Sequence, residues 1–432
     1  MLLLLTLRSV CAAVLSASSA LVLPDAPTIA TLLGRWGSGP EREVVRFDAA
    51  EASAGPLGDE RRLVHVAARG FAALGSKSQA TAALKRRDLL LNGETVEGCR
   101  RVSDGDLIEL NLPQPKRLAG DALDARVRFV RHLLEQGLSV LYEDEALAVV
   151  RKPAGVHTKR NTNPKYGALE DALPAILEPP DLSCMREVIP RPDDVGDEFS
   201  GKCMDEALPL PLAMHRLDVR VRGLCVVAKS RIACARLSRA FESRRVTKTY
   251  HALIVGHLPE AVLAAGEITS PVSGMEARTL VRELRREPHV QWGYLSRVEL
   301  KPITGRTHQL RVHMASLGTP IVGDDLYWDL ARESRAAAAM RPDAVKNVLD
   351  GSVASGVSSG EVVGAACELL DALPNVRRGG LFLESCAVQL QHPWSGEEVA
   401  VCADDLPRFD QLLDKAVRGV AVEEEGSEGG NN

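Results

Sequence analysis

Apolar and polar positions alternate along much of this chain in patterns that predict short strands joined by a few helices. Residues 246–256, VTKTYHALIVG, follow the period of two that is typical of a strand, which would place Tyr250, Ala252 and Ile254 on one face. The apolar run that begins at Gly223, GLCVVA, predicts a further strand. Strand pairs are predicted in residues 139–156 and 379–401, the first around an acidic turn, and a short helix in residues 167–177. The pattern alone therefore indicates a mixed protein of helices and strands.

A compact basic segment precedes these elements. Residues 84–110 have the pattern of a helix end, a strand, a tight turn at Asn92–Gly93 and a second hairpin. Residues 61–117 hold 11 Lys and Arg against 6 Asp and Glu, whereas the whole chain has a formal net charge of −5. Local positive charge favours phosphate binding through counterion release. An ordinary solvated helix face is the alternative, and the two hairpin signals favour a small RNA-binding domain at 61–117.

Composition marks the segments that we expect to lie outside the folded domains. The first 23 residues are apolar with no acid and one Arg, and the run ASSA at 17–20 resembles a cleavage site, which predicts a targeting presequence at 1–40. Its destination would be a plastid or mitochondrion, with the cytoplasm as the alternative, and we expect no membrane span in the mature protein. A linker is predicted at residues 44–58. Two inserts are predicted at 179–211 and 329–378, and the second is expected to contain a helix and a flexible loop. Residues 416–432 are expected to form an acidic disordered tail.

The bulk composition is that of a soluble globular protein with two or three domains, because 45% of the 432 residues are hydrophobic and 26% are charged. The nine cysteines form no CxxC pair, which predicts free thiols in a reducing compartment and no zinc site. His308 and His313 lie five residues apart, a spacing that does not suit a helical metal pair.

Four segments with candidate chemistry follow one another in a fixed order. They are HRLD at 215–218, GLCVVAKS at 223–230, VTKTYHALIVG at 246–256 and TGRTHQLRVHMASLGTPIVGDDLYW at 304–328. Together they resemble the pseudouridine synthases of the RluA branch, enzymes that isomerise uridine within RNA. The resemblance implies a catalytic domain at 139–415 with an α+β fold, in which a mixed, largely antiparallel sheet is split into two halves around a central cleft. It also implies a monomer with RNA as its partner and neither cofactor nor metal.

The resemblance assigns catalytic roles to three residues. Asp218 matches the catalytic carboxylate of the family, although a turn or helix-cap aspartate is the alternative. Tyr250 would stack on the flipped uracil and offer its hydroxyl for proton transfer, or else be a core tyrosine. Arg311 matches the arginine that keeps the catalytic carboxylate ionised and oriented. His215 is expected to be a packed, hydrogen-bonded histidine rather than a general base.

The same resemblance predicts contacts with RNA. Arg216 matches the arginine that fills the space left by the flipped base. Lys248 would face the same way as Tyr250 and contact phosphate or a carboxylate, and Arg306 is expected to be structural or to contact RNA. Residues 84–110 resemble the small RNA-binding fold named after ribosomal protein S-four. In that segment Lys85, Arg86 and Arg87 are the expected RNA ligands, and its presence favours ribosomal RNA over transfer RNA.

One departure from the family pattern opens an alternative. Thr-Ser usually occupies the third and fourth positions after the catalytic aspartate, but here Val221 and Arg222 stand there. This change alone would favour a degenerate protein that binds and folds RNA without turnover. A glycoside hydrolase is a second alternative, but it normally needs two cooperating carboxylates. The pair Asp324–Asp325 fits a structural turn better than that role.

Overall fold

The computed structural model describes residues 24–36, 42–46, 62–71, 74, 77–96, 100–111, 119–160, 167–181, 207–289, 292–339, 380–403 and 406–416. Contacts along the chain divide it into two compact units. The first comprises residues 1–217, 225–245 and 391–399, and the second comprises residues 218–224, 246–390 and 400–432. The chain passes from the first unit to the second between Leu217 and Asp218.

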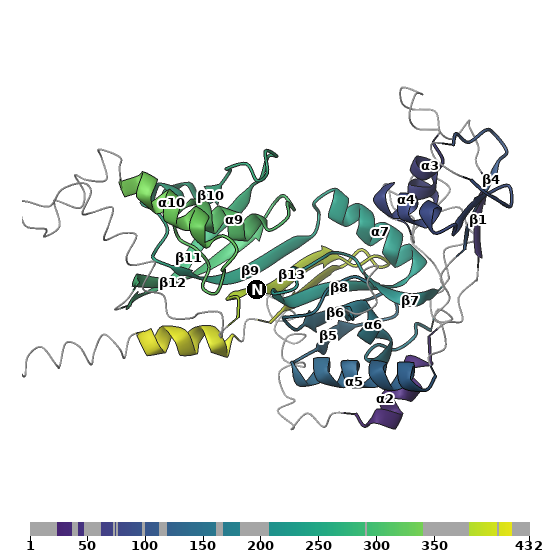
Figure 1. Ribbon diagram of the computed structural model, residues 1–432, viewed down its shortest axis with the longest axis horizontal. Helices are drawn as coiled ribbons and strands as arrows, with labels where there is room; N and C mark the ends of the chain where they lie inside the picture. Colours follow the sequence, from purple (N-terminus) through teal and green to yellow (C-terminus); the bar gives the residue numbers. More distant parts are fainter. Residues whose placement is uncertain are drawn as a thin grey trace, which may run out of the picture. The chain divides into compact units, whose positions relative to one another are not determined.

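Within the first unit, a small domain combines two helices with a four-stranded antiparallel sheet (Figure 1). The helices are α3 (Leu63–Gly70) and α4 (Lys77–Lys85), and the strand order is β1 (Arg42–Arg46), β4 (Leu107–Asn111), β2 (Leu89–Leu91), β3 (Glu94–Thr95). Apolar side chains from helices and strands form one core, which includes Leu63, Ala67, Phe71, Ala83, Leu89, Leu91, Ile108 and Leu110. Burial of these side chains supplies the driving force for this domain to fold.

The predicted Asn-Gly hairpin is confirmed. Asn92 and Gly93 have φ angles of 53° and 82°, the positive values that a tight two-residue turn requires. The Asn92 amide then joins two loops: its nitrogen donates to the Asp106 carboxylate at 2.8 Å, and its oxygen accepts from the Leu107 backbone N–H at 2.8 Å. The linker predicted at 44–58 begins too early, because residues 44–46 belong to β1, whose backbone pairs with β4.

The rest of the first unit is a sheet covered by helices. Its strands are β5 (Ser139–Glu143), β6 (Leu147–Lys152), β7 (Ala207–Ala213) and β8 (Arg222–Ser230), of which β8 lies between β6 and β7. The helices are α5 (Asp121–Glu135), α6 (Leu169–Ala172), the 3-10 turn η1 (Leu173–Ala175) and α7 (Arg231–Glu242). The strands predicted in 139–156 and 223–230 and the short helix predicted in 167–177 are thus confirmed.

The N-terminal segment corrects one prediction. We expected residues 1 to 40 to lie outside the fold, but residues 26–33 form helix α2 (Ala26–Leu33), which Asp25 caps by accepting the Thr28 N–H at 2.9 Å. Ile29 and Trp36 are buried in the same core as α5 and η1, and the Trp36 indole donates to the Leu177 carbonyl. The predicted boundary at 40 is therefore too late, because this apolar stretch covers a core. Residues 1–23, the main part of the predicted presequence, lie outside the described residues.

The second unit is built on a mostly antiparallel set of strands. Their order is β10 (Glu267–Ile268), β11 (Thr279–His289), β12 (Gly293–Pro302), β9 (Thr247–Val255), β13 (Leu383–Gln391), and β13 also pairs in parallel with the first residues of β8. Helices α8 (Glu260–Ala265), α9 (Gln309–Ser316), α10 (Trp328–Ala339) and a helix at 407–416 accompany the strands. Side chains of that last helix, Phe409 and Leu413 among them, pack on Leu253, Leu295 and Phe382. The α+β class with a large mixed, largely antiparallel sheet is confirmed.

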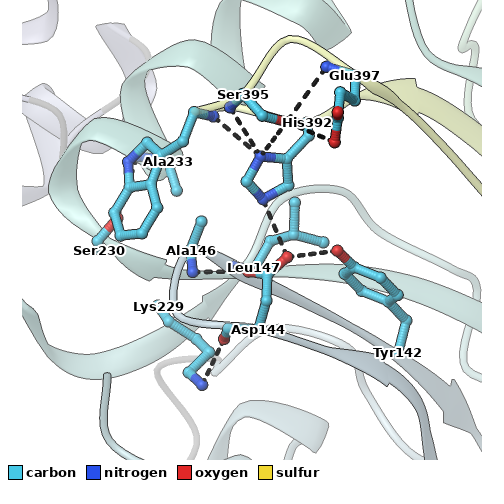
Figure 2. Close-up of polar contacts among 11 residues, drawn as sticks. Tyr142, Asp144, Ala146, Leu147, Lys229, Ser230, Ala233, His392, Ser395 and Glu397 are labelled. Atoms are coloured by element: carbon cyan, nitrogen blue, oxygen red, sulfur yellow. Dashed lines mark hydrogen bonds and ion pairs between the residues drawn. The ribbon is translucent and has the colours of Figure 1, made fainter. Parts of the chain in front are cut away.

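A network centred on Asp144, here named the Asp144 clasp, holds three segments of the first unit together (Figure 2). Tyr142 donates its hydroxyl and His392 its Nε2 to the same carboxylate oxygen, at 2.5 and 2.9 Å. The backbone N–H groups of Ala146 and Leu147 donate to the other oxygen at 2.7 and 2.9 Å. Nearby, the buried Lys229 ammonium binds the Asp144 carbonyl.

The predicted inserts and tail need shorter bounds. Residues 207–211 belong to β7, and α10 starts the segment predicted as the second insert and supplies its expected helix. Strands β13 and β14 (Glu398–Cys402) confirm the pair predicted in 379–401. Ala416 ends a helix and is buried, so the tail can begin only after it. Residues 182–206, 340–379 and 417–432 lie outside the described residues, and within the described part no helix has the length and apolarity needed to cross a bilayer.

Candidate active site

Asp218 lies at the start of a turn that leads into β8. The Val221 N–H donates to the Asp218 carbonyl at 3.0 Å and closes this turn, and Val221 itself is buried. Gly223 follows with a φ of 125°, and a Cβ there would meet the Ser385 carbonyl oxygen at 2.2 Å. Only glycine allows β13 to approach the turn so closely. The Asp218 side chain is left 30% exposed, accessible to a substrate.

The segment after Asp218 is also fixed from the other side. The Arg220 guanidinium forms an ion pair with Asp325 and donates to the Gly323 carbonyl at 2.6 Å. Gly323 has a φ of 82°, and a Cβ there would meet the Gly380 carbonyl oxygen at 2.0 Å. The GDDLYW segment is therefore a tight turn held against its neighbours, as its sequence predicted.

Arg311, on helix α9, is the cation nearest to Asp218 in the described chain. Its guanidinium is only 4% exposed and donates through Nε and Nη2 to the two oxygens of Asp324, both at 2.7 Å. Its Nη1 lies 3.6 Å from Asp218 Oδ2. Burial lowers the pKa of this guanidinium, but the hydrogen bonds and charge of Asp324 and the charge of Asp218 raise it, with a net rise. Arg311 is therefore a permanent, rigidly held positive charge beside Asp218.

His308 is a second neighbour of Asp218. Its Nε2 lies 3.6 Å from Asp218 Oδ2, the oxygen that Arg311 also faces. Its Nδ1 is 2.8 Å from the Tyr327 hydroxyl. The Tyr327 ring also lies beneath the Arg311 guanidinium, 5.2 Å from its carbon to the ring centroid. His308 has a φ of 55°, a left-handed conformation that few non-glycine residues adopt.

Tyr250 is buried in β9, where it pairs with Ser385 of β13 on one side and Leu300 of β12 on the other. Ser385 in turn pairs with Gly223, so Tyr250, Ser385 and Gly223 lie side by side across three strands. With strands about 4.8 Å apart, Tyr250 and Gly223 are separated by about 10 Å between Cα atoms. Tyr250 thus lies two strands away from β8, the strand that follows the Asp218 turn. A contact of Tyr250 with Asp218 or with uracil stays a prediction.

The remaining predicted residues of the catalytic domain differ in their exposure and in their contacts. Lys248 is half-buried on β9, and burial lowers the pKa of its ammonium. Arg216 is exposed. Arg306 donates to the Glu276 carbonyl at 2.9 Å, which supports the structural part of its predicted role. His215 accepts the Val226 N–H at 3.1 Å and packs on Phe241, as the sequence predicted.

The predicted RNA ligands of the small domain follow the end of α4. Lys85, Arg86 and Arg87 are all exposed, and Arg87 has a left-handed φ of 63° that ends the helix. Arg86 forms an ion pair with Asp88 at 2.6 Å. The three side chains therefore gather on the surface next to β2.

Comparison with known proteins identifies the family. Residues 146–316 match the family model of RNA pseudouridylate synthases. A protein of Aquifex aeolicus named as an uncharacterized RNA pseudouridine synthase is 30% identical over 282 residues, which cover 62% of this chain and 78% of that protein. The chain belongs to the RNA pseudouridylate synthase family. It is an isomerase that acts on RNA, and the predicted enzyme class and fold are confirmed.

Two further relatives show that this synthase is of the RluA type. The chain is 32% identical over 209 residues to the dual-specificity RNA pseudouridine synthase RluA of Haemophilus influenzae, covering 45% of this chain and 78% of that one. It is 28% identical over 267 residues to the ribosomal large subunit pseudouridine synthase C of Rickettsia conorii, covering 57% and 75%.

The structure of this synthase brings together some predicted site residues and adds others. Asp218 and Arg311 lie side by side, as predicted. His308, Asp324 and Tyr327 also belong to this site, although the sequence suggested no role in it for them. All three stand in the segment 304–328 that carried the resemblance, so the signal was present. What the sequence could not supply was the long-range pairing of their side chains.

The departure at Val221 and Arg222 does not disrupt the site. Val221 packs in the interior, and the Arg222 guanidinium lies 3.6 Å from the buried carboxylate of Glu384 on β13. Within the described residues, no cluster of three or more His, Cys, Asp or Glu side chains could hold a metal ion. His313 contacts the Thr279 hydroxyl and the Ser270 carbonyl, which occupy both of its ring nitrogens.

Proposed function

We propose that this synthase isomerises a uridine that has been turned out of a structured ribosomal RNA, and that Asp218 is the reacting carboxylate. The observation that carries the proposal is the Asp218 carboxylate itself: it is partly exposed, and one of its oxygens faces a buried arginine that is already bound by another carboxylate. The buried Arg311 guanidinium can therefore hold this oxygen of Asp218 in a fixed orientation.

The reaction needs no redox change. The bond between uracil N1 and ribose C1′ breaks, a bond between C5 and C1′ forms, C5 loses a proton and N1 gains one. A carboxylate suffices for this isomerisation, either as a nucleophile or as a base at the sugar. Tyr250 would stack on the uracil and take part in proton transfer, and its place in β9, two strands from Gly223, supports that role.

The target base must leave the helical stack before Asp218 can reach the sugar. We assign the space left by the base to Arg216, which is exposed and stands two residues before Asp218 in the chain. Lys248 and Arg306 would contact the backbone of the RNA near the site. A planar guanidinium suits the role of Arg216, because it can stack on bases and bind phosphate.

The small domain would bind RNA in the manner of the fold named after ribosomal protein S-four. Its exposed Lys85, Arg86 and Arg87 at the end of α4 and its excess of positive charge support this assignment. One relative is named for the large ribosomal subunit and another for dual specificity. The additional RNA-binding domain makes ribosomal RNA the favoured substrate over transfer RNA. The apolar residues 1–23 support an address to a plastid or mitochondrion, which fractionation of cells that express the full chain would test.

The test is pseudouridine mapping by carbodiimide-dependent primer extension on total RNA. Cells with the native gene are compared with cells that carry Asp218→Ala, and with Asp121→Asn on the exposed face of α5 as the matched control. We expect specific pseudouridines in ribosomal RNA to vanish only with Asp218→Ala. Loss of sites in transfer RNA would instead make transfer RNA the substrate. An unchanged profile, with Asp218→Ala protein present at native levels, would refute the catalytic role of Asp218.

A further inference from the structure

The two oxygens of the Asp218 carboxylate differ in their side-chain contacts. Both of its described side-chain contacts, from Arg311 Nη1 and from His308 Nε2, reach Oδ2 at 3.6 Å. These are ion-pair distances, longer than a hydrogen bond. Contacts of catalytic groups often tighten only when substrate is bound. Both described side-chain contacts therefore fall on one oxygen, Oδ2, and neither of them reaches Oδ1.

His308 is itself oriented by Tyr327. The Tyr327 hydroxyl is 2.8 Å from His308 Nδ1, and the two rings meet edge to face at 84°. An ionised carboxylate only accepts hydrogen bonds. The favourable arrangement is thus Tyr327 O–H donating to Nδ1 and Nε2–H pointing to Asp218, and a protonated imidazole would also present Nε2–H. The site pairs one permanent donor, Arg311, with one histidine donor.

The backbone also indicates a purpose for His308. Its left-handed conformation, with φ 55° and ψ 21°, comes directly before helix α9. Such a conformation costs free energy in a residue with a side chain and persists where the surroundings enforce it, often at functional sites. Here the surroundings are the Tyr327 hydroxyl on one ring nitrogen and the Asp218 carboxylate on the other.

From these contacts we propose that His308 is a positioning residue for the reaction. Together with Arg311 it fixes Asp218 Oδ2, with its own orientation set by Tyr327, so that Oδ1 is the oxygen that reacts at the ribose. This inference rests on the proposed catalytic role of Asp218. It gives His308 a role through Asp218 rather than through a metal or through direct contact with the base.

Two substitutions separate this role from a backbone effect, because the two explanations rank them in opposite order. His308→Gln keeps a donor near the position of Nε2, whereas His308→Asn does not reach it. Asparagine tolerates the left-handed conformation better than glutamine does. A positioning role therefore predicts that the Gln variant retains more activity, and a purely conformational role predicts that the Asn variant does.

The experiment measures kcat and KM by tritium release from C5 of uridine in ribosomal RNA. For His308→Asn we expect kcat to fall on the order of 10²-fold with KM unchanged, as for a small misplacement of a catalytic group. We expect His308→Gln to stay within about tenfold of the wild type, and Tyr327→Phe to lose less than His308→Asn. Thermal unfolding of each variant shows that the losses come from the folded enzyme.

A spectroscopic readout is independent of turnover. In protein labelled with ¹⁵N-histidine, the His308 signals are assigned by their loss in His308→Asn, and we expect them to show a proton on Nε2 that shifts in Asp218→Asn. Equal kcat in the Asn variant and the wild type, or a proton found only on Nδ1, would overturn the inference. If Asp218→Asn itself keeps full activity, the proposed catalytic role fails instead, so the two failures are distinguishable.

Discussion

Two aspartates in this synthase lie beside the same types of residue but differ in how many hydrogen bonds their carboxylates accept. Asp144 and Asp218 each face a histidine Nε2, and in each case a tyrosine hydroxyl belongs to the same network. The Asp144 oxygens together accept four hydrogen bonds between 2.5 and 2.9 Å. Among the described residues, the Asp218 carboxylate has two side-chain contacts, both at 3.6 Å and on one oxygen. A saturated carboxylate stabilises a fold, whereas an unsaturated one next to a fixed cation can react.

The histidines differ in the same way. The Nδ1 of His392 accepts the Ser395 N–H at 3.0 Å (Figure 2). It also accepts the Trp394 N–H at 3.3 Å, so the backbone of its own loop fixes the orientation of the ring. Ser395 Oγ also lies 3.2 Å from that nitrogen. Asp144, His392 and Ser395 therefore have the residue types of a hydrolytic triad. They cannot act as one, because the Nδ1 lone pair of His392 already accepts backbone N–H groups and cannot take the serine proton. His308 instead depends on one side-chain hydroxyl.

The largest expected effect would come from removing the Asp218 charge. Asp218→Asn keeps the side-chain volume and leaves Arg311 bound to Asp324. We expect kcat/KM to fall on the order of 10³-fold or more, because the reacting group is lost, and the free energy of unfolding to change by less than about 1 kcal/mol. Tritium release and urea unfolding measure the two quantities. A loss of several kcal/mol in stability with activity preserved would make Asp218 structural, like Asp144.

Asp324→Asn should affect both stability and activity, because it removes the buried carboxylate that binds the Arg311 guanidinium through two hydrogen bonds. Breaking a buried ion pair from one side costs about 3–5 kcal/mol, and we also expect lower kcat in the protein that remains folded. The matched control is Asp325→Asn, next in the chain and 40% exposed, for which we expect a stability loss below about 1 kcal/mol. Equal unfolding midpoints for the two variants would show that Asp324 does not hold Arg311.

Asp144→Asn should separate stability from catalysis in the opposite direction to Asp218→Asn. The amide keeps one acceptor oxygen but cannot satisfy all four donors, so we expect a loss of about 1–3 kcal/mol in the free energy of unfolding. The kcat of the folded enzyme should stay within about twofold of the wild type. The control is Glu397→Gln, an exposed change in the loop that carries His392. It should shift the free energy of unfolding by less than about 0.5 kcal/mol. A large drop in kcat for Asp144→Asn, measured well below the unfolding midpoint, would contradict the comparison.

The sequence predicted the parts of this molecule that depend on local pattern. The strand around Tyr250, the Asn92–Gly93 hairpin and the GDDLYW turn follow from side-chain period and turn residues. The proximity of Asp218 and Arg311 came from resemblance to a family and not from spacing. The partner of each carboxylate, by contrast, is a long-range property: Asp144 meets His392 across 248 residues.

Helix α2 shows why composition could not fix the end of the predicted presequence. An apolar segment looks the same in the sequence whether it is an address or covers a core, and only the packing of Ile29 and Trp36 distinguishes the two. Arg222 shows the converse. Its place four residues after Asp218 favoured a protein without turnover, but in the structure its guanidinium lies 3.6 Å from the Glu384 carboxylate, on a strand that is distant in the sequence.

The smallest expected effect is on the pH dependence of stability. Burial raises the pKa of the Asp144 carboxyl, but hydrogen bonds from His392, Tyr142 and the Leu147 N–H outweigh it, so the net pKa lies below the ordinary value of 3.8. The unfolded state therefore binds the proton more tightly, and the stabilisation by Asp144 is present above about pH 4 and lost as pH falls through the lowered pKa. Asp171, which is bound by Arg126 and Arg160, contributes to the same acid slope. Only the difference between the wild type and Asp144→Asn isolates Asp144. Urea unfolding from pH 6 to pH 3 should show the gap between the two proteins narrowing with acid, and a gap that widens would mean that the carboxylate is not stabilised by its four donors.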